Sequence, residues 1–477
     1  MKSCPYCKKE INVNWSYCHH CSKPLLVNLN KEIGKQIPQS RDINSYLIYD
    51  KDPSISSPLP QPYDLETIGE DDFSLKIQKI DKRIQQRVIF GESIGSLQLE
   101  KANLYYQKRD LTSSLKTLES AVILFTDDSD LLNTAISYNE MGLIYDEMGF
   151  FDDALNRFEQ AIEILKDLPE HKLIIQIYNN LANVYHHLEN LEKSYEYYDK
   201  ALKLAERENF ALEEIKTSSN LVELLFLLKE YGKIERILKR NLEYFRYTDD
   251  NYGVIISLTK MGKLYYFMGE SRYKQANQSL KDSLDLITKI GTYDLLMKAK
   301  LKWECYLYLG KLALAQNNFE LAEEYLHKSL ETIRILEEKN INECLILEPL
   351  AHLHEFNGGY TKAIKYYKIC KDSYQKFGND VRIAELKYKI AHIYLENIKD
   401  ESEAIKFYEE ALEIFEDLNY SRESAEILHK LGDIYLNREI IELALEYFEK
   451  AKEFYQEFQD EYNLNLIMSK INSLIKE

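Results

Sequence analysis

Four cysteines near the start of the chain are the residues best suited to chemistry. Cys4 and Cys7 form one CxxC pair, and Cys18 and Cys21 form a second pair, with ten residues between the two pairs. Each CxxC turn places two sulfur atoms on one side of a metal ion, and the short loop between the pairs folds back to complete a tetrahedron. The spacing therefore predicts a site for one ion with four thiolate ligands.

Zinc is the predicted metal. Four thiolates also suit iron, but a closed tetrahedral sulfur site is typical of structural zinc and leaves no open position for a substrate. The CPYC sequence at Cys4 also permits a redox-active dithiol, which needs Cys4 at the N-terminus of a helix beside a strand–helix–strand unit. Nothing in the neighbouring sequence predicts such a unit, so the redox site is the alternative hypothesis.

The first residues resemble the short zinc-ribbon family, whose usual form is two CPxCG turns with an aromatic residue between them. Tyr17 fills the aromatic position, and Leu25 fills the apolar position after the second turn. Lys8 and Ser22 stand where the family has glycine. The resemblance implies a small zinc ribbon over residues 1–25, with structural Zn²⁺ bound by the four cysteines.

Proline marks the end of this segment. Seven of the nine prolines precede residue 63, and the run DPSISSPLPQP from Asp52 to Pro62 cannot hold a helix. Residues 26–72 are therefore predicted to form a Pro-rich flexible linker.

From residue 92 onward the chain repeats itself. Two clear copies are YNEMGLIYDEMGFFDDALNRFEQAIEIL from Tyr138 and YNNLANVYHHLENLEKSYEYYDKALKLA from Tyr178. Each copy predicts two helices joined by a turn. In the first copy, Gly142 is the small residue of the first helix, and Phe158 precedes the small residue Ala161 in the second helix. Small residues let two helices approach closely, and the aromatic residues are expected to fill the gap between successive pairs.

This pattern resembles the tetratricopeptide repeat family, with intervals of 40 to 46 residues instead of the usual period of about 34. HEAT-type repeats share the longer period but lack the spacing of small and aromatic residues. The resemblance implies an all-α fold, a right-handed α-solenoid of about nine helix pairs over residues 92–461, with capping helices over 73–91 and 462–477. The small position of the second helix recurs at Ala121, Ala161, Ala201, Asn241, Ser283, Ser329, Cys370, Ala411 and Ala451.

The resemblance also implies that the first helices line a concave groove suited to a peptide or to a helix of a partner. An asparagine amide both donates and accepts, so a row of asparagines can hold a peptide main chain, and lysines there could meet an acidic group or a terminal carboxylate. The alternative is that these are polar residues suited to any wet surface. The residues carried over from the family pattern are Asn103, Asn139, Asn179, Asn183, Lys263 and Lys311.

Three histidines occupy similar positions on successive repeats: His352, His392 and His429. A metal site or a pH-sensitive patch is one interpretation. Consecutive first helices lie about 10 Å apart, which is awkward for imidazoles around a single ion, so isolated solvated histidines are the favoured interpretation.

Charge and hydropathy limit the classes of partner. Residues 1–40 hold six lysines and two acidic residues, whereas the whole chain has a net charge of −18. Neither part is typical of a protein that binds a polyanion. No apolar run is long enough for a membrane span, and the sequence MKSCPYCKKE lacks the apolar core of a secretion signal, so a cytoplasmic protein is predicted. Cys305, Cys344 and Cys370 are predicted to be small buried hydrophobic residues.

The sequence contains no phosphate-binding glycine loop, HExxH motif or nucleophile elbow, so it predicts no enzyme. The predicted function is a scaffold or adaptor that binds a peptide or protein segment in the concave groove. The alternative is a nucleic-acid-linked transcriptional regulator, in which the repeats sense a ligand and the ribbon contacts nucleic acid through Trp15 and Tyr6. The sequence leaves the identity of the partner and the oligomeric state open.

Overall fold

The computed structural model describes residues 2–3, 10–11, 70–85, 93–336, 342–376, 378–457 and 459–475. The predicted zinc ligands Cys4, Cys7, Cys18 and Cys21 lie outside these residues, as does nearly all of the predicted linker. Near the N-terminus, strands β1 (Lys2–Ser3) and β2 (Glu10–Ile11) form an antiparallel pair.

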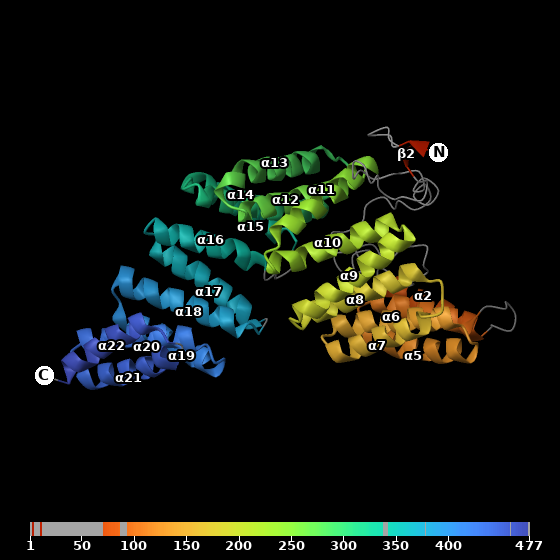
Figure 1. Ribbon diagram of the computed structural model, residues 1–477. Helices are drawn as coiled ribbons and strands as arrows, with labels where there is room; N and C mark the ends of the chain where they lie inside the picture. Colours follow the sequence, from red (N-terminus) through yellow and green to blue (C-terminus); the bar gives the residue numbers. More distant parts are fainter. Residues whose placement is uncertain are drawn as a thin grey trace. The chain divides into compact units, whose positions relative to one another are not determined.

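All other elements in the described residues are helices (Figure 1). The predicted capping segments overlap the first and the last of them. In chain order the helices are α2 (Glu70–Gln85), α4 (Ile94–Gln107), α5 (Leu111–Asp127), α6 (Leu131–Glu147), α7 (Phe151–Leu165), α8 (His171–His187), α9 (Leu191–Glu208), α10 (Ala211–Leu227), α11 (Tyr231–Tyr247), α12 (Asn251–Phe267), η4 (Glu270–Arg272), α13 (Tyr273–Lys289), α14 (Leu295–Ala315), α15 (Phe319–Arg334), α16 (Asn342–Phe356), α17 (Tyr360–Lys376), α18 (Asp380–Ile393), η5 (Tyr394–Ile398), α19 (Glu401–Asp417), α20 (Ser421–Asn437), α21 (Ile441–Glu457) and α22 (Glu461–Leu474).

The chain divides into two compact units: unit 1, Met1–Ser271, and unit 2, Arg272–Glu477. Helices α4 to α21 follow one another in the order of nine helix pairs, with the even-numbered helices as first helices and the odd-numbered ones as second helices. The predicted all-α architecture of repeated helix pairs is confirmed for the described residues.

Side-chain caps begin many of these helices. Asp130 accepts a hydrogen bond from the backbone N–H of Asn133 at the start of α6, and Asn190 accepts one from Lys193 at the start of α9. A free backbone N–H at a helix start needs such a partner, and Asp and Asn are among the best residues for this position. The helix boundaries therefore follow from local sequence.

The turn between the two helices of a pair contains a residue with positive φ in each repeat of unit 1. One residue there takes the left-handed conformation, which lets the chain reverse after a first helix. The positions are spaced by forty residues: Arg109, Gly149, Glu189, Lys229 and Gly269. Only two of the five are glycine, so the left-handed conformation recurs every forty residues even where the residue type does not favour it.

Close helix packing forms the core of unit 1. A Cβ atom added to Gly142 in α6 would lie 2.6 Å from the ring of Phe158 in α7, so no larger residue fits there without displacing the ring. Phe158 and Ala161 are fully buried. The close approach predicted at the small residue is confirmed, but the Phe158 ring contacts Gly142 within its own helix pair, whereas the sequence placed the aromatic residues between successive pairs.

Unit 2 repeats this packing. A Cβ atom added to Gly432 in α20 would lie 2.5 Å from the ring of Phe448 in α21. Cys305, Cys344 and Cys370 are fully buried, as predicted for small apolar residues. A single helix pair cannot bury its own apolar surface, so each pair depends on its neighbours for stability.

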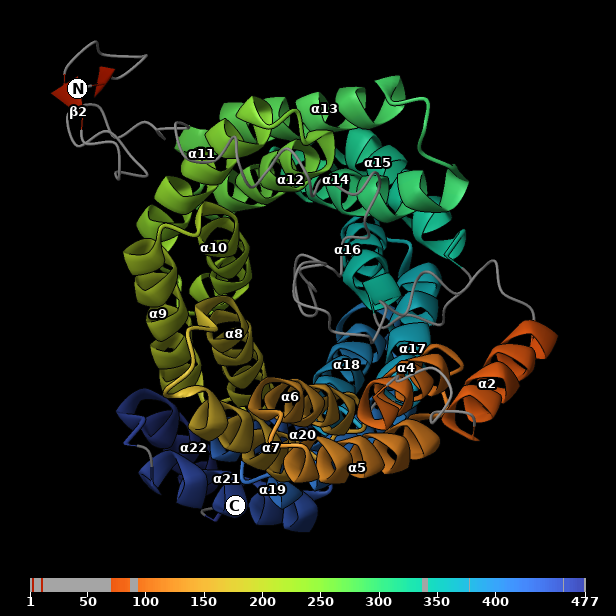
Figure 2. The ribbon, with the colours of Figure 1, turned by 90° about the vertical axis from the view of Figure 1, so that its right-hand side faces the viewer.

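The first helices of unit 1 lie on one side of it. Figure 2 shows α8 and α10 on the inner side of the curve, with α9 and α11 outside them. We call the side formed by α4, α6, α8, α10 and α12 the first-helix face of unit 1. Across the described ranges, none of the helices combines the length and the apolar composition needed to cross a lipid bilayer.

Candidate peptide-binding face

Helix α8 carries three asparagines whose side chains form hydrogen bonds to other helices: Asn179, Asn180 and Asn183. The side-chain amide of Asn179 donates to the Ile175 carbonyl at 2.9 Å and to Thr217 Oγ1 of α10 at 2.8 Å. These two bonds fix the orientation of the amide and join α8 to α10. The oxygen of Asn179 has no hydrogen-bond partner among the described residues.

Asn183 lies one turn after Asn179. Its side-chain oxygen accepts a hydrogen bond from the hydroxyl of Tyr198 in α9, and its side-chain nitrogen has no partner among the described residues. Asn183 is 7% exposed and Tyr198 is 3% exposed. Burial raises the pKa of Tyr198, so its hydroxyl remains a donor and holds the amide in one orientation.

A second pair of asparagines joins α8 to α6. The side-chain nitrogen of Asn180 donates to the side-chain oxygen of Asn139 at 3.0 Å, and both residues are buried. Asn139 therefore uses its oxygen within the protein. Asn103 of α4 is partly buried, and its side-chain oxygen has no partner among the described residues.

The two amides on α8 leave two buried atoms unpaired among the described residues, the acceptor Asn179 Oδ1 and the donor Asn183 Nδ2, one helical turn apart. Side chains spaced by four residues on a helix lie about 5–6 Å apart at Cβ. An acceptor and a donor at this spacing match the N–H and C=O groups of a peptide main chain. An unpaired buried polar group costs free energy, so a ligand that satisfies both groups gains stability from them.

A charged cluster joins α10 to α12 on the same face. The Lys260 and Lys263 ammonium groups lie 3.2 and 3.1 Å from the Glu223 carboxylate. Burial alone would raise the pKa of Glu223, but the two lysines outweigh it and hold this pKa at about 2. A small hollow beside the cluster is lined in part by Ser219, Ser257 and Lys260.

The predicted lysines therefore have neighbours of their own. Lys263 pairs with Glu223, and its ammonium group lies 4.5 Å from the ring centroid of Phe226. Lys311 belongs to α14 in unit 2, where its ammonium group lies 5.4 Å from the ring centroid of Tyr308. Their predicted contact with an acidic group of a ligand stays a prediction.

The predicted histidine row has no arrangement for a metal. His352 is exposed, whereas His392 and His429 are partly buried. Among the described residues, no group of three or more histidine, cysteine or acidic side chains is placed to hold a metal ion. The nitrogen of His429 lies 2.9 Å from the Lys470 ammonium group instead.

The sequence analysis did not identify several polar residues that link helices on the first-helix face. Their common feature is that they pair with a polar residue about one repeat away: Asn180 with Asn139, Thr217 with Asn179, and Glu223 with Lys263. Polar residues at matching positions in successive repeats are the signal that would have identified them.

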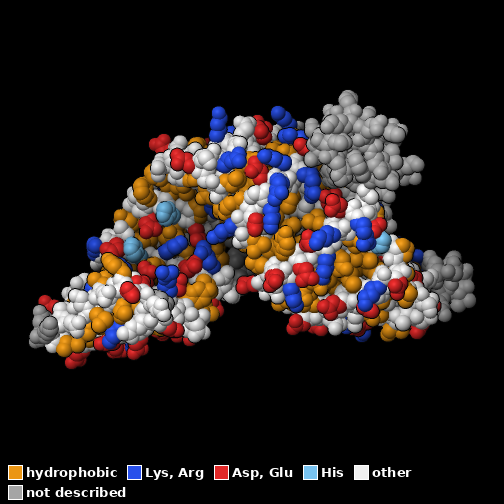
Figure 3. All heavy atoms as spheres, viewed as in Figure 1, with side chains coloured by type: hydrophobic (Ala, Val, Ile, Leu, Met, Phe, Trp, Pro, Cys, Tyr) orange, Lys and Arg blue, Asp and Glu red, His pale blue; other side chains and the backbone are white. Residues whose placement is uncertain are grey.

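The surface charge is mixed. On the face drawn in Figure 3, lysine and arginine side chains are interspersed with acidic ones. A nucleic-acid backbone prefers a continuous basic surface. The described residues on this face do not form one.

Family comparisons agree with the repeat pattern. Models of the tetratricopeptide repeat match residues 93–167, 175–207 and 382–457. The chain contains tetratricopeptide repeats. The first two ranges lie in unit 1 and include α4 to α7 and most of α8 and α9, so they cover the asparagines of the first-helix face. A search of curated protein sequences gives no match.

One solved structure shares the fold over most of this chain, and two others have lower scores. The apo form of the quorum sensor NprR from B. thuringiensis has a TM-score of 0.50 and 16% identity, covering 72% of this chain and 99% of that chain. At this identity the similarity concerns the fold alone. NprR in complex with its cognate peptide NprX has a TM-score of 0.42 and 18% identity, covering 72% and 94% of the two chains. A Rap protein complexed with competence and sporulation factor has a TM-score of 0.35 and 16% identity, covering 85% and 100%.

Proposed function

We propose that the chain is a non-catalytic scaffold or adaptor, and that the first-helix face of unit 1 binds an extended peptide or protein segment by its main chain. The observation that supports this most is the pair of buried side-chain atoms on α8 that have no hydrogen-bond partner among the described residues, Asn179 Oδ1 and Asn183 Nδ2. Main-chain groups are common to all peptides, so this pair provides affinity, and neighbouring side chains provide selectivity.

Both asparagine amides are fixed before a ligand arrives. Asn179 is held by Thr217, and Asn183 is held by Tyr198. Each amide is hydrogen-bonded within the protein at one end, and its other end is buried without a partner among the described residues. Side chains that are already ordered lose little conformational entropy on binding, which favours affinity.

The experiment is a double substitution, Asn179→Ala with Asn183→Ala, in the full chain. Mass spectrometry of copurified proteins identifies partners, and a pull-down with each partner measures capture. We expect the double variant to capture at least one partner several-fold more weakly, because two hydrogen bonds of about 1 kcal/mol each are lost.

The matched control is Asn156→Ala, an exposed asparagine on the second helix α7 of the same unit. This variant should capture every partner as the unchanged chain does. If the double variant also retains every partner in full, the first-helix face is not the binding surface.

The N-terminal cysteines support a separate proposal: a structural zinc ion held by Cys4, Cys7, Cys18 and Cys21. Strands β1 and β2 pair antiparallel on either side of the first CxxC in the sequence, with Ser3 opposite Glu10. A closed zinc site would stabilise this segment and perform no reaction. Metal analysis of the purified chain should find one zinc per chain, whereas the redox alternative predicts no metal and a titratable dithiol.

A further inference from the structure

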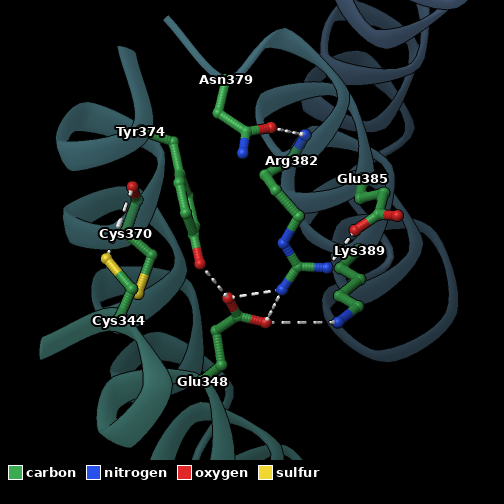
Figure 4. Close-up of polar contacts among 8 residues, drawn as sticks. All are labelled: Cys344, Glu348, Cys370, Tyr374, Asn379, Arg382, Glu385 and Lys389. Carbon is green, nitrogen blue, oxygen red and sulfur yellow. Dashed lines mark hydrogen bonds and ion pairs between the residues drawn. The ribbon is translucent and has the colours of Figure 1, made fainter. Parts of the chain in front are cut away.

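Two buried thiols in unit 2 lie side by side. Cys344 belongs to α16 and Cys370 to α17, and both are fully buried. Figure 4 shows their sulfur atoms next to each other between the two helices. Cys344 Sγ lies 3.9 Å from the backbone carbonyl oxygen of Cys370. Nothing in the proposed peptide-binding function uses this pair.

The two cysteines occupy positions where the helices of a pair approach closely. In the preceding pair, α14 and α15, the same two positions hold Trp303 and Ser329, and the Ser329 hydroxyl donates to the Trp303 carbonyl at 2.6 Å. A disulfide requires Cβ atoms about 3.5–4.5 Å apart. The contact of Cys344 Sγ with the Cys370 carbonyl oxygen shows that α16 and α17 approach closely at these two residues.

Other repeats place small residues at this pair of positions. Ala135 and Ala161 occupy them in α6 and α7, and Ala425 and Ala451 occupy them in α20 and α21. All four alanines are fully buried. Alanine satisfies the packing at this place, so packing alone does not require two thiols there.

The two thiols are chemically unequal. A hydrogen bond from the Cys370 thiol lowers the pKa of Cys344, although burial opposes this, and the Ser373 hydroxyl adds to the lowering. The same bond, together with burial, raises the pKa of Cys370. The thiolate is the reactive form of cysteine, so Cys344 is the better nucleophile and Cys370 remains a thiol.

We propose that Cys344 and Cys370 form a reversible disulfide when the chain meets a hydroperoxide. The Cys344 thiolate attacks the peroxide oxygen, the O–O bond breaks, and the products are a sulfenic acid on Cys344 and water or an alcohol. The Cys370 thiol then attacks the sulfenic sulfur, the S–S bond forms, and a second water molecule leaves with the thiol proton. The two thiols together lose two electrons, which the peroxide accepts.

Hydrogen peroxide is close to water in size, and local opening of a folded chain admits molecules of this size to buried groups. Because the Cys370 thiol is adjacent, the sulfenic acid on Cys344 reacts with it to form the disulfide. A thiol exchanger such as dithiothreitol reverses the bond.

The disulfide would join α16 and α17 next to the contacts that hold α18. Glu348, one turn after Cys344, accepts two hydrogen bonds from Arg382 of α18, each at 2.6 Å. Tyr374, one turn after Cys370, donates to the same carboxylate at 3.1 Å (Figure 4). Oxidation therefore adds a covalent bond to one end of a polar cluster that links three helices.

The test treats the folded full-length chain with hydrogen peroxide, blocks the remaining thiols after unfolding, and maps the peptides by mass spectrometry. We expect a peptide that links Cys344 to Cys370, lighter than its reduced parts by two hydrogen atoms and absent after dithiothreitol. Cys305 is the internal control, because its sulfur lies 3.5 Å from the Ser283 hydroxyl. It should remain a free thiol in the same sample.

The variant Cys370→Ala places at this position the residue that several other repeats carry, so it should fold. Without the second thiol, Cys344 should stop at the sulfenic acid, which dimedone traps. Oxidation of the unchanged chain should also raise its unfolding temperature, and Cys370→Ala should lose that rise. Free Cys344 and Cys370 thiols after peroxide treatment, or separate oxidation of each to sulfinic acid, would overturn the proposal.

Discussion

The links around α8 in unit 1 differ in chemistry from those around α16 and α20 in unit 2. Around α8 in unit 1 the links include uncharged hydrogen bonds: Asn180 to Asn139 of α6 and Asn179 to Thr217 of α10. In unit 2 the corresponding links use carboxylates. Glu348 of α16 pairs with Arg382 of α18, and Asp433 of α20 pairs with Lys470 of α22.

This difference determines which hydrogen-bond donors and acceptors remain unpaired on each surface. An amide has a donor end and an acceptor end, so it can bind a neighbouring helix with one end and a ligand with the other. An ion pair in good geometry occupies both of its partners. The α8 region of unit 1 thus keeps hydrogen-bonding atoms that are buried but unpaired among the described residues, whereas the ion pairs described in unit 2 mainly hold helices together.

The largest effect should come from Glu348→Ala in unit 2. The substitution leaves Arg382 and the Tyr374 hydroxyl without their shared acceptor, and the Glu348 side chain is only 14% exposed. We expect a loss of about 2 kcal/mol in the free energy of unfolding, because Arg382 remains partly solvated. Chemical denaturation measures the loss, and hydrogen exchange should increase in α16 and α18.

The control is Glu385→Ala, which removes the other carboxylate that Arg382 contacts. That contact lies within α18, and the Glu385 side chain is 39% exposed. Exposed pairs of this kind contribute about 0.5 kcal/mol or less. Equal losses from the two substitutions would show that the link between α16 and α18 has no special role.

A smaller loss should follow Asn180→Ala in unit 1. It removes the amide that donates to Asn139, and the Asn139 oxygen loses that partner in a buried position. We expect a loss of about 1 kcal/mol, the usual contribution of an uncharged hydrogen bond. Because no charge is involved, the loss should be the same at low and high salt, whereas salt should reduce the effect of Glu348→Ala. A strong salt dependence for Asn180→Ala would contradict the comparison.

Local pattern was enough to predict the close approach inside a helix pair. Gly142 was predicted to lie where the two helices approach closely because small residues recur at fixed places in each repeat, and the structure confirms this, whereas the contact of Phe158 with Gly142 inside the pair was not predicted. Both residues belong to one helix–turn–helix unit, so their contact depends only on short-range geometry.

The partners of the polar residues could not be predicted in the same way. The sequence identified Asn139 and Asn179, but their partners Asn180 and Thr217 depend on how neighbouring first helices align, which no local pattern specifies. Lys263 was predicted to meet a ligand, yet Glu223 of the preceding first helix already pairs with it. Contacts between repeats therefore limit what the sequence alone can assign to a site.

Two histidines should titrate in opposite directions in the two units. In unit 1, a hydrogen bond with the Asp146 carboxylate raises the pKa of His187, although burial opposes the rise. In unit 2, burial and then the Lys470 charge lower the pKa of His429, against the opposing charges of Asp433 and Glu426. Selective labelling and NMR titration should place the two values on either side of the ordinary histidine value of about 6.5.

The sign of the effect on stability follows from these directions. The contribution of His187 should be complete below pH 6.5 and disappear as the pH rises through its folded-state pKa, because folding favours the charged form. The contribution of His429 should be present above pH 6.5 and disappear as the pH falls through its lower folded-state pKa, because folding favours the neutral form. Replacing each histidine by glutamine and comparing the pH profiles of stability isolates the two contributions. Profiles that change in the same direction would remove this contrast between the units.

The smallest effect should be the same in both units. Glu189 in unit 1 and Glu439 in unit 2 both occupy the left-handed position of the turn after a first helix, with φ of 57° and 62°. A residue with a Cβ atom is strained in this conformation, and glycine is not, although glycine also makes the unfolded chain more flexible. Glu189→Gly and Glu439→Gly should each stabilise the chain by about 0.5 kcal/mol, measured by chemical denaturation. Gains of equal sign would show that the turns behave alike in the two units, whereas a gain in one unit and a loss in the other would show a difference between the turns.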